Sequence, residues 1–243
     1  MPGAGLGAPL LVPLRHGPVP YHRLMTYARD ERLALCALLD DVGPDAPTLC
    51  AGWRTADLAA HLVLREHRPD AGAGVLGGPL AGHTRRVQRR LTTRTPYPEL
   101  VQVIRTGPPR LSVFAIPGVD QRANLSEYFV HHEDVRRAQA GWQPRQLDPG
   151  LSELLWQGLR MARFLLRKSP VGVELARDDH PAGSSGRPAA VRITARARTP
   201  VVTVTGPPAE LALWTMGRTT VARVRLDGSE ADVTALASPD WRV

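Results

Sequence analysis

GWRTADLAAHLVLRE (residues 52–66) and SEYFVHHEDVRRA (residues 126–138) are the stretches that decide the fold of this chain. Both space their apolar residues as a packed helix does. The first carries His61, and the second carries Glu127 and His131, which lie about one turn apart on one helix face. Two neutral imidazoles and one carboxylate suit a borderline divalent metal and leave a coordination position open. If His61 reaches that face, the chain holds a metal site of the catalytic type.

The rest of residues 25–140 is also predicted to be helical. Helices are expected at 27–42, 55–67 and 83–94, from about residue 98 until GPPR (107–110), and at 121–138. Thr55 is the expected N-cap of the second helix, and Asp57 in its first turn suits the helix dipole. These helices have the number and lengths of a small bundle.

Residues 1–24 are rich in proline and glycine and show no periodicity. Their prolines break the apolar stretch and no basic region precedes it, so a secretory signal is not expected. We predict a disordered extension, and Met25, where the helical pattern begins, is an alternative start of translation.

The second half of the chain changes its hydrophobic period. GWQPRQLDPG (141–150) is predicted to be a linker, followed by a long helix at 151–168. Strands are expected at 171–177, 190–196, 201–206 and 221–228, with short helices at 207–218 and 229–236. Residues 151–243 are therefore predicted to form a small α+β domain, and the chain as a whole belongs to the α+β class.

Composition excludes some classes of protein. The net charge of +8 comes almost entirely from arginine, since Lys168 is the only lysine. The arginines at 85–94 face one side of a helix, and no helix-turn-helix or zinc-finger pattern accompanies them, so nucleic-acid binding is not expected. No apolar run is long enough to span a membrane. Two cysteines, Cys36 in a helix and Cys50 in a loop, suit a reducing cytoplasm rather than a disulfide framework.

The two helix motifs together resemble the DinB-like metal-binding four-helix bundle, and more closely the mycothiol-dependent maleylpyruvate isomerase group. VVTVTGPPAELALWTMGR (201–218) with RVRLDG (223–228) resembles the sterol-carrier-like domain that follows the bundle in that group. The resemblance covers about Met25 to Leu236. It implies a zinc ion held by His61, Glu127 and His131, mycothiol as cosubstrate, and Arg218 as the arginine that helps to bind an anionic substrate.

Each of these residues also has a simpler interpretation. His61 could be an interior histidine with one hydrogen bond, and Glu127 could pair with an arginine such as Arg122. Arg218 could serve only as a charge at the C-terminus of a helix.

The neighbours of the candidate ligands carry further alternatives. His132 lies about 100° around the helix from His131, so it is expected to be a surface residue or a neighbour of the site rather than a ligand. Asp134 and Asp57 could each hydrogen-bond a ligand imidazole or be solvated carboxylates. Trp53 and Trp214 are expected to pack in a core or between domains rather than to line a pocket.

The expected function is that of a metal- and thiol-dependent isomerase or S-transferase acting on a small electrophile. The metal is expected to be Zn²⁺, with Fe²⁺ and Ni²⁺ as alternatives because they accept the same ligands. A hydrolase would follow if water occupied the open position. A non-catalytic metal- or small-molecule-binding protein is the main alternative. The protein is expected in the cytoplasm, as a monomer or homodimer, without a membrane partner.

Overall fold

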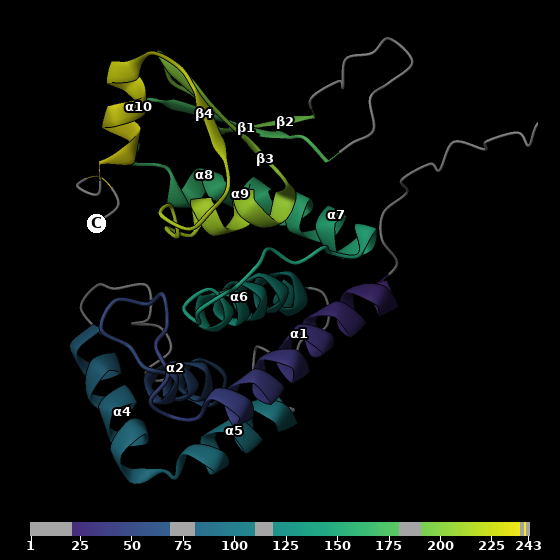
Figure 1. Ribbon diagram of the computed structural model, residues 1–243, viewed down its shortest axis with the longest axis vertical. Coiled ribbons are helices and arrows are strands. Elements are labelled where there is room, and N and C mark those ends of the chain that lie inside the picture. The colour runs from purple at the N-terminus through teal and green to yellow at the C-terminus, as the bar shows by residue number, and fades with distance from the viewer. Residues whose placement is uncertain (1–20, 69–80, 110–118, 180–190, 239–240, 242–243) are drawn as a thin grey trace, which may run out of the picture.

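The computed structural model describes residues 21–68, 81–109, 119–179, 191–238 and 241, and the side chains of 21–26 and 119–123 are not described. Helices fill the N-terminal half, and a four-stranded sheet with its own helices follows (Figure 1). The predicted α+β class, with a helical part followed by a small α+β part, is confirmed. The expectation for residues 1–20 lies outside the described residues.

The N-terminal part is built from α1 (Tyr21–Val42), α2 (Thr55–His67), α4 (Ala81–Arg94), α5 (Tyr97–Thr106) and α6 (Val119–Arg136). Helix α1 packs along α6 and α5, and α2 packs against α4 and α5. Pro96 separates α4 from α5, because the residue before a proline is disfavoured in helical conformation. The described part of this region thus has five helices, one more than a four-helix bundle needs.

The C-terminal part places helices on one face of a sheet. Helix α7 (Pro149–Gly158), a 3₁₀ turn (Leu159–Met161) and α8 (Ala162–Leu165) lead into the sheet. Its strands are β1 (Gly172–Arg177), β2 (Arg192–Arg196), β3 (Val201–Gly206) and β4 (Arg225–Asp227), in the order β2-β1-β3-β4. Strands β1 and β3 are parallel, and both edge strands are antiparallel to their neighbours.

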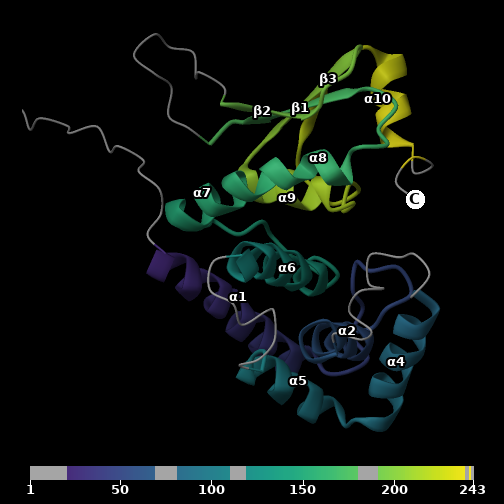
Figure 2. The ribbon, with the colours of Figure 1, turned by 180° about the vertical axis from the view of Figure 1, so that it is seen from behind.

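Helix α9 (Pro208–Thr215) lies between the sheet and α6 (Figures 1 and 2). Helix α10 (Glu230–Ala237) packs beside β3, and its N-cap Ser229 accepts a hydrogen bond from the backbone of Asp232. Gly217 has a φ of 87°, a left-handed conformation that favours glycine and ends α9 just before Arg218.

Helix α6 is shared by the two halves of the molecule. Its Tyr128 and Val135 belong to the hydrophobic core of the bundle, whereas its Leu125, Phe129 and Val130 belong to the core formed with α7, α9 and the sheet. A helix surrounded in this way buries polar residues as well as apolar ones. The two cores therefore meet on the element that carries Glu127 and His131.

Several boundaries differ from those expected from the sequence. Helix α1 begins at Tyr21, earlier than expected, and the helix predicted for 151–168 is interrupted by the 3₁₀ turn after Gly158. Glycine weakens a helix, and at this position it lies close to Ser126 of α6. The strand expected at 221–228 pairs only over Arg225–Asp227. None of the described helices is long and apolar enough to cross a bilayer.

Candidate metal centre

His61, Glu127 and His131 meet between α2 and α6. The Nε2 atom of His61 lies 3.3 Å from Oε1 of Glu127, and Nε2 of His131 lies 3.2 Å from the same oxygen. The imidazole rings stand edge to face with centroids 5.2 Å apart. One nitrogen or oxygen from each residue falls within 4.8 Å of the others, a separation that could accommodate a metal ion. Glu127 and His131 thus lie on the same face of α6, as their helical spacing predicted, and His61 of α2 reaches that face.

The electrostatics of this cluster favour an ionised carboxylate beside one neutral imidazole. Burial opposes the charge of Glu127, yet hydrogen bonds with His131 and His61 outweigh it and hold the pKa of Glu127 well below its usual value. Burial lowers the pKa of His61. Burial also disfavours the charged form of His131, but hydrogen bonds with Asp134, Cys50 and Glu127 raise the pKa of His131 well above its usual value.

Asp134 joins His131 to the second half of the molecule. This carboxylate is completely buried, and its Oδ2 lies 2.8 Å from Nδ1 of His131. Cys50 donates to the same oxygen over 3.2 Å, and Arg218 Nε donates to Oδ1 over 2.8 Å. Burial would raise the pKa of Asp134, but the bonds from His131 and Arg218 lower it to about 2. The prediction that Asp134 orients a site imidazole fits this geometry, and a solvated carboxylate does not.

Arg218 enters the site from the turn after α9. Besides its two bonds to Asp134, it donates from Nη1 to the carbonyl of Met216 over 2.6 Å. Its Nη2 lies 3.5 Å from Sγ of Cys50. Burial opposes its charge, and the bond to Asp134 outweighs that effect, so the pKa of Arg218 is raised. Arg218 is therefore a fixed cation beside His131 rather than a solvated charge at a helix end.

An open pocket of about 560 Å³ reaches this cluster. His61, Glu127 and His131 line it together with Cys50 and Arg218. Trp53 also lines it, with its ring centroid 5.1 Å from that of His61. Trp53 also packs against the hydrophobic core of the bundle, as expected, so it contributes to that core and to the pocket wall at once. Trp214 is buried in the second core, as expected.

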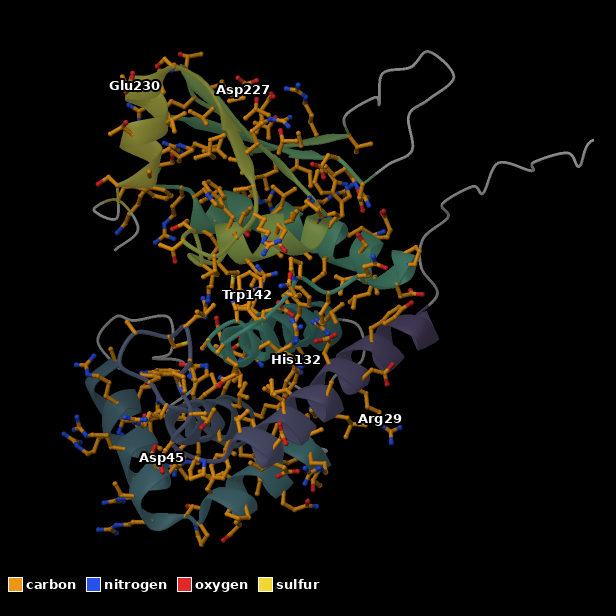
Figure 3. All side chains as sticks on the ribbon, in the orientation of Figure 1. Arg29, Asp45, His132, Trp142, Asp227 and Glu230 are labelled. Atoms are coloured by element: carbon orange, nitrogen blue, oxygen red, sulfur yellow. The ribbon has the colours of Figure 1, made fainter. Side chains whose placement is uncertain are left out.

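His132 and the N-cap of α2 differ from expectation. His132 is buried, and its Nδ1 lies 2.9 Å from Oε2 of Glu31 on α1. Figure 3 accordingly places it between α6 and α1. It is neither a surface residue nor a neighbour of the pocket, because α6 is covered on that face too. Helix α2 begins at Thr55, so Arg54 rather than Thr55 is its N-cap. Asp57 lies in the first turn, as expected, and accepts the backbone N–H of Arg54 over 3.1 Å.

Sequence reasoning missed two residues of the site. Arg65 lies on α2 one turn after His61, and its Nε is 3.5 Å from Oε1 of Glu127. This is the arginine that pairs with Glu127, whereas the side chain of Arg122 lies outside the described residues. The i,i+4 spacing of His61 and Arg65 was a usable signal. Cys50 gave no such signal, since its place depends on a loop whose Leu49 N–H bonds the carbonyl of Asp134 over 3.0 Å.

Comparison with known proteins agrees with this fold. Residues 26–68 match the model of the mycothiol maleylpyruvate isomerase N-terminal domain. The crystal structure of a mycothiol-dependent maleylpyruvate isomerase is similar with a TM-score of 0.56 and 16% identity, over 86% of this chain and 93% of that one. A histidine-to-alanine mutant of that enzyme gives a TM-score of 0.55 and 15% identity over the same shares. No curated protein matches the chain in sequence.

Proposed function

We propose that this protein binds a divalent metal, preferentially zinc, and uses it in a thiol-dependent isomerase or S-transferase reaction on a small electrophilic acid. The observation that carries the proposal is the convergence of two imidazole Nε2 atoms on one carboxylate oxygen of the partly buried Glu127, at 3.3 and 3.2 Å, where a pocket reaches them. A carboxylate withdrawn from water needs compensating charge. In the metal-free protein, Arg65 and the proton that the raised pKa of His131 retains supply it. A divalent cation held by His61, Glu127 and His131 would displace that proton and take over its role.

The donor set fits a zinc ion. Two imidazoles and one carboxylate are the three protein ligands typical of catalytic zinc sites. His131 turns its Nδ1 toward Asp134, which leaves Nε2 free to face Glu127. Carboxylates commonly orient ligating imidazoles in this way. Fe²⁺ and Ni²⁺ accept the same donors.

A bound divalent cation would promote the loss of the proton from a coordinating thiol at neutral pH. Around that position, the protein provides a cation and a partly apolar wall. Arg218 is held by Asp134 and Met216, so it meets an anionic substrate in a fixed orientation. Trp53 and Val130 line the same pocket and reduce the access of water to it.

The identity of the thiol and the reaction rest on the similar proteins. Both similar crystal structures are those of a mycothiol-dependent maleylpyruvate isomerase. Addition of a thiolate to an activated alkene, followed by rotation and elimination, isomerises the double bond and returns the thiol. Retention of the adduct would instead make the protein an S-transferase.

The test compares two neighbouring histidines. His131→Gln is expected to abolish stoichiometric zinc, measured by elemental analysis of untagged protein, whereas His132→Gln should retain it because His132 faces Glu31. Both residues are equally buried, at 7% exposure, so the second variant controls for damage to the helix. Loss of zinc only in the His132 variant would overturn the assignment.

A second measurement tests the proposed reaction independently of metal binding. Maleylpyruvate would be incubated with zinc-loaded protein, with and without mycothiol. Conversion of this cis substrate to its trans isomer would be followed by chromatography. Thiol-dependent conversion that His131→Gln removes would support the enzyme. Full zinc occupancy without conversion, or with a stable thiol adduct, would favour a binding protein or an S-transferase respectively.

A further inference from the structure

An exposed apolar and basic segment lies on the opposite half of the molecule from α2. Of the six exposed large apolar residues among those described, three lie within five positions, with exposed fractions of 59% for Met161, 49% for Phe164 and 45% for Leu165. Leu159, Ala162 and Leu166, which recur at the helical spacing of three and four residues, are buried beneath them. Figure 2 shows this segment in front of α9, at the surface of the helical layer under the sheet. The chain thus presents apolar side chains where a surface helix ordinarily carries polar ones.

The same segment is strongly basic. We call it the α8 patch; its members are Arg160, Met161, Arg163, Phe164, Leu165, Arg167 and Lys168. All seven are exposed, and no acidic residue occurs in the sequence from residue 154 to residue 173. The guanidinium of Arg163 lies 4.7 Å from the ring centroid of Phe164, and Arg167 donates to the carbonyl of Phe164 over 2.9 Å. Cations and apolar groups are therefore interleaved on one surface.

The neighbouring strand also carries basic residues. Strand β2 packs beside the 3₁₀ turn and α8, and it is an edge of the sheet. Arg196 ends this strand, and exposed Arg198 follows, with its carbonyl beside Gly172 just after the patch. Two further arginines therefore occur along the edge strand that neighbours α8 and in the loop after it.

We propose that the α8 patch docks onto an anionic lipid surface. A basic segment with exposed phenylalanine, leucine and methionine is the composition of helices that lie in a membrane interface. Each cation near an acidic bilayer strengthens binding about fivefold, since it contributes about 1 kcal/mol. Insertion of Phe164 and Leu165 adds an apolar contribution that salt does not screen.

Two other occupants fit the patch less well. A second copy of the chain joined through the same face would oppose the arginines of the two copies, which is unfavourable. A stable protein interface takes about 20–30 residues from each partner, whereas the patch has seven. A bilayer needs no matched surface of that size, because it deforms around a few inserted side chains.

The experiment is co-sedimentation of the full chain with vesicles made of equal parts phosphatidylglycerol and phosphatidylcholine, beside vesicles of phosphatidylcholine alone. Binding to the anionic vesicles only is expected. The double substitution Phe164→Ser with Leu165→Ser should reduce the partition coefficient by about tenfold or more. Arg163→Gln with Arg167→Gln should reduce it by roughly 25-fold. Both pairs are exposed, and unchanged thermal unfolding would show that the fold is kept.

The arginine-rich helix α4 offers a matched control. Arg85→Gln with Arg89→Gln removes two exposed charges of the same kind from a helix without exposed large apolar residues, and it should leave vesicle binding within about twofold of the parent. An equal loss in the α4 variant would mean that binding follows net charge alone and would overturn the proposal. Absence of anionic-vesicle binding at low salt would also overturn it. If the patch variant instead abolished a concentration-dependent self-association, the surface would be a protein interface.

Discussion

A buried ion pair fastens the two halves of the molecule. Arg137, just after α6, donates from Nη1 and Nη2 to the two carboxylate oxygens of Glu210 on α9, over 2.9 and 2.6 Å. It also donates from Nε to Glu133 over 2.6 Å and from Nη1 to the carbonyl of Val221 over 3.0 Å. The Arg137 side chain is only 1% exposed. Trp142 covers it in the space between the bundle and α9 (Figure 3), with the guanidinium 4.7 Å from the ring centroid.

Arg137→Met would leave the Glu210 carboxylate buried without its cation. Glu133 would keep Arg136 and Arg145, at 2.9 and 2.7 Å, so the unpaired charge falls mainly on Glu210. Removal of one partner of a buried pair costs about 3–5 kcal/mol, a large part of a total stability of about 5–15 kcal/mol. We expect this loss in the free energy of unfolding, measured by urea denaturation with circular dichroism.

The double substitution of Arg137→Met with Glu210→Met tests the reasoning. It removes both charges, so it should be less destabilised than the sum of the single variants by about 2–3 kcal/mol. Arg105→Met is the matched control, because its partner Asp40 is half exposed, and it should cost less than about 1 kcal/mol. A loss below about 1 kcal/mol for Arg137→Met, or strict additivity in the double variant, would refute the argument.

Two further outcomes are expected. Asp134→Asn should weaken zinc affinity by about 10- to 100-fold, measured by chelator competition, because it removes the anion that orients a ligating imidazole; an unchanged affinity would speak against that role. Gly107→Ala should destabilise the protein by about 1–3 kcal/mol in thermal unfolding, since Gly107 has a φ of 85° and an added Cβ would lie against Arg32. Gly82→Ala, where the added Cβ meets nothing within 4 Å, should be neutral or stabilising, and an equal loss there would contradict the explanation.

The sequence predicted the elements whose pattern is local. Apolar periodicity located α2 and α6, and a spacing of four residues placed Glu127 and His131 on one face. The α+β class followed from the change of period near residue 170. The break after Gly158 and the shortness of β4 were not predicted, because each depends on contacts between distant elements rather than on the segment itself.

The error over His132 has a specific physical cause. Two adjacent histidines on a helix point about 100° apart, so the helical geometry correctly placed His131 and His132 on different faces. The further step, that a residue off the ligand face is exposed, assumed a helix with one buried stripe. Helix α6 is instead enclosed by α1 on one side and by α7 and α9 on another. Its polar residues are therefore buried in pairs, His132 with Glu31 and Glu133 with Arg137.

This enclosure links the candidate site to the joint between the two halves. Glu127, His131 and Asp134 follow one stripe of α6, and Glu133 and Arg137 follow another. The second stripe holds α9 through Glu210, and the turn that ends α9 carries Arg218 to Asp134 on the first. The position of Arg218 beside His131 thus depends on how α9 is seated. The buried pair has a geometric consequence beyond stability, because it fixes the distance at which the C-terminal half meets the candidate ligands.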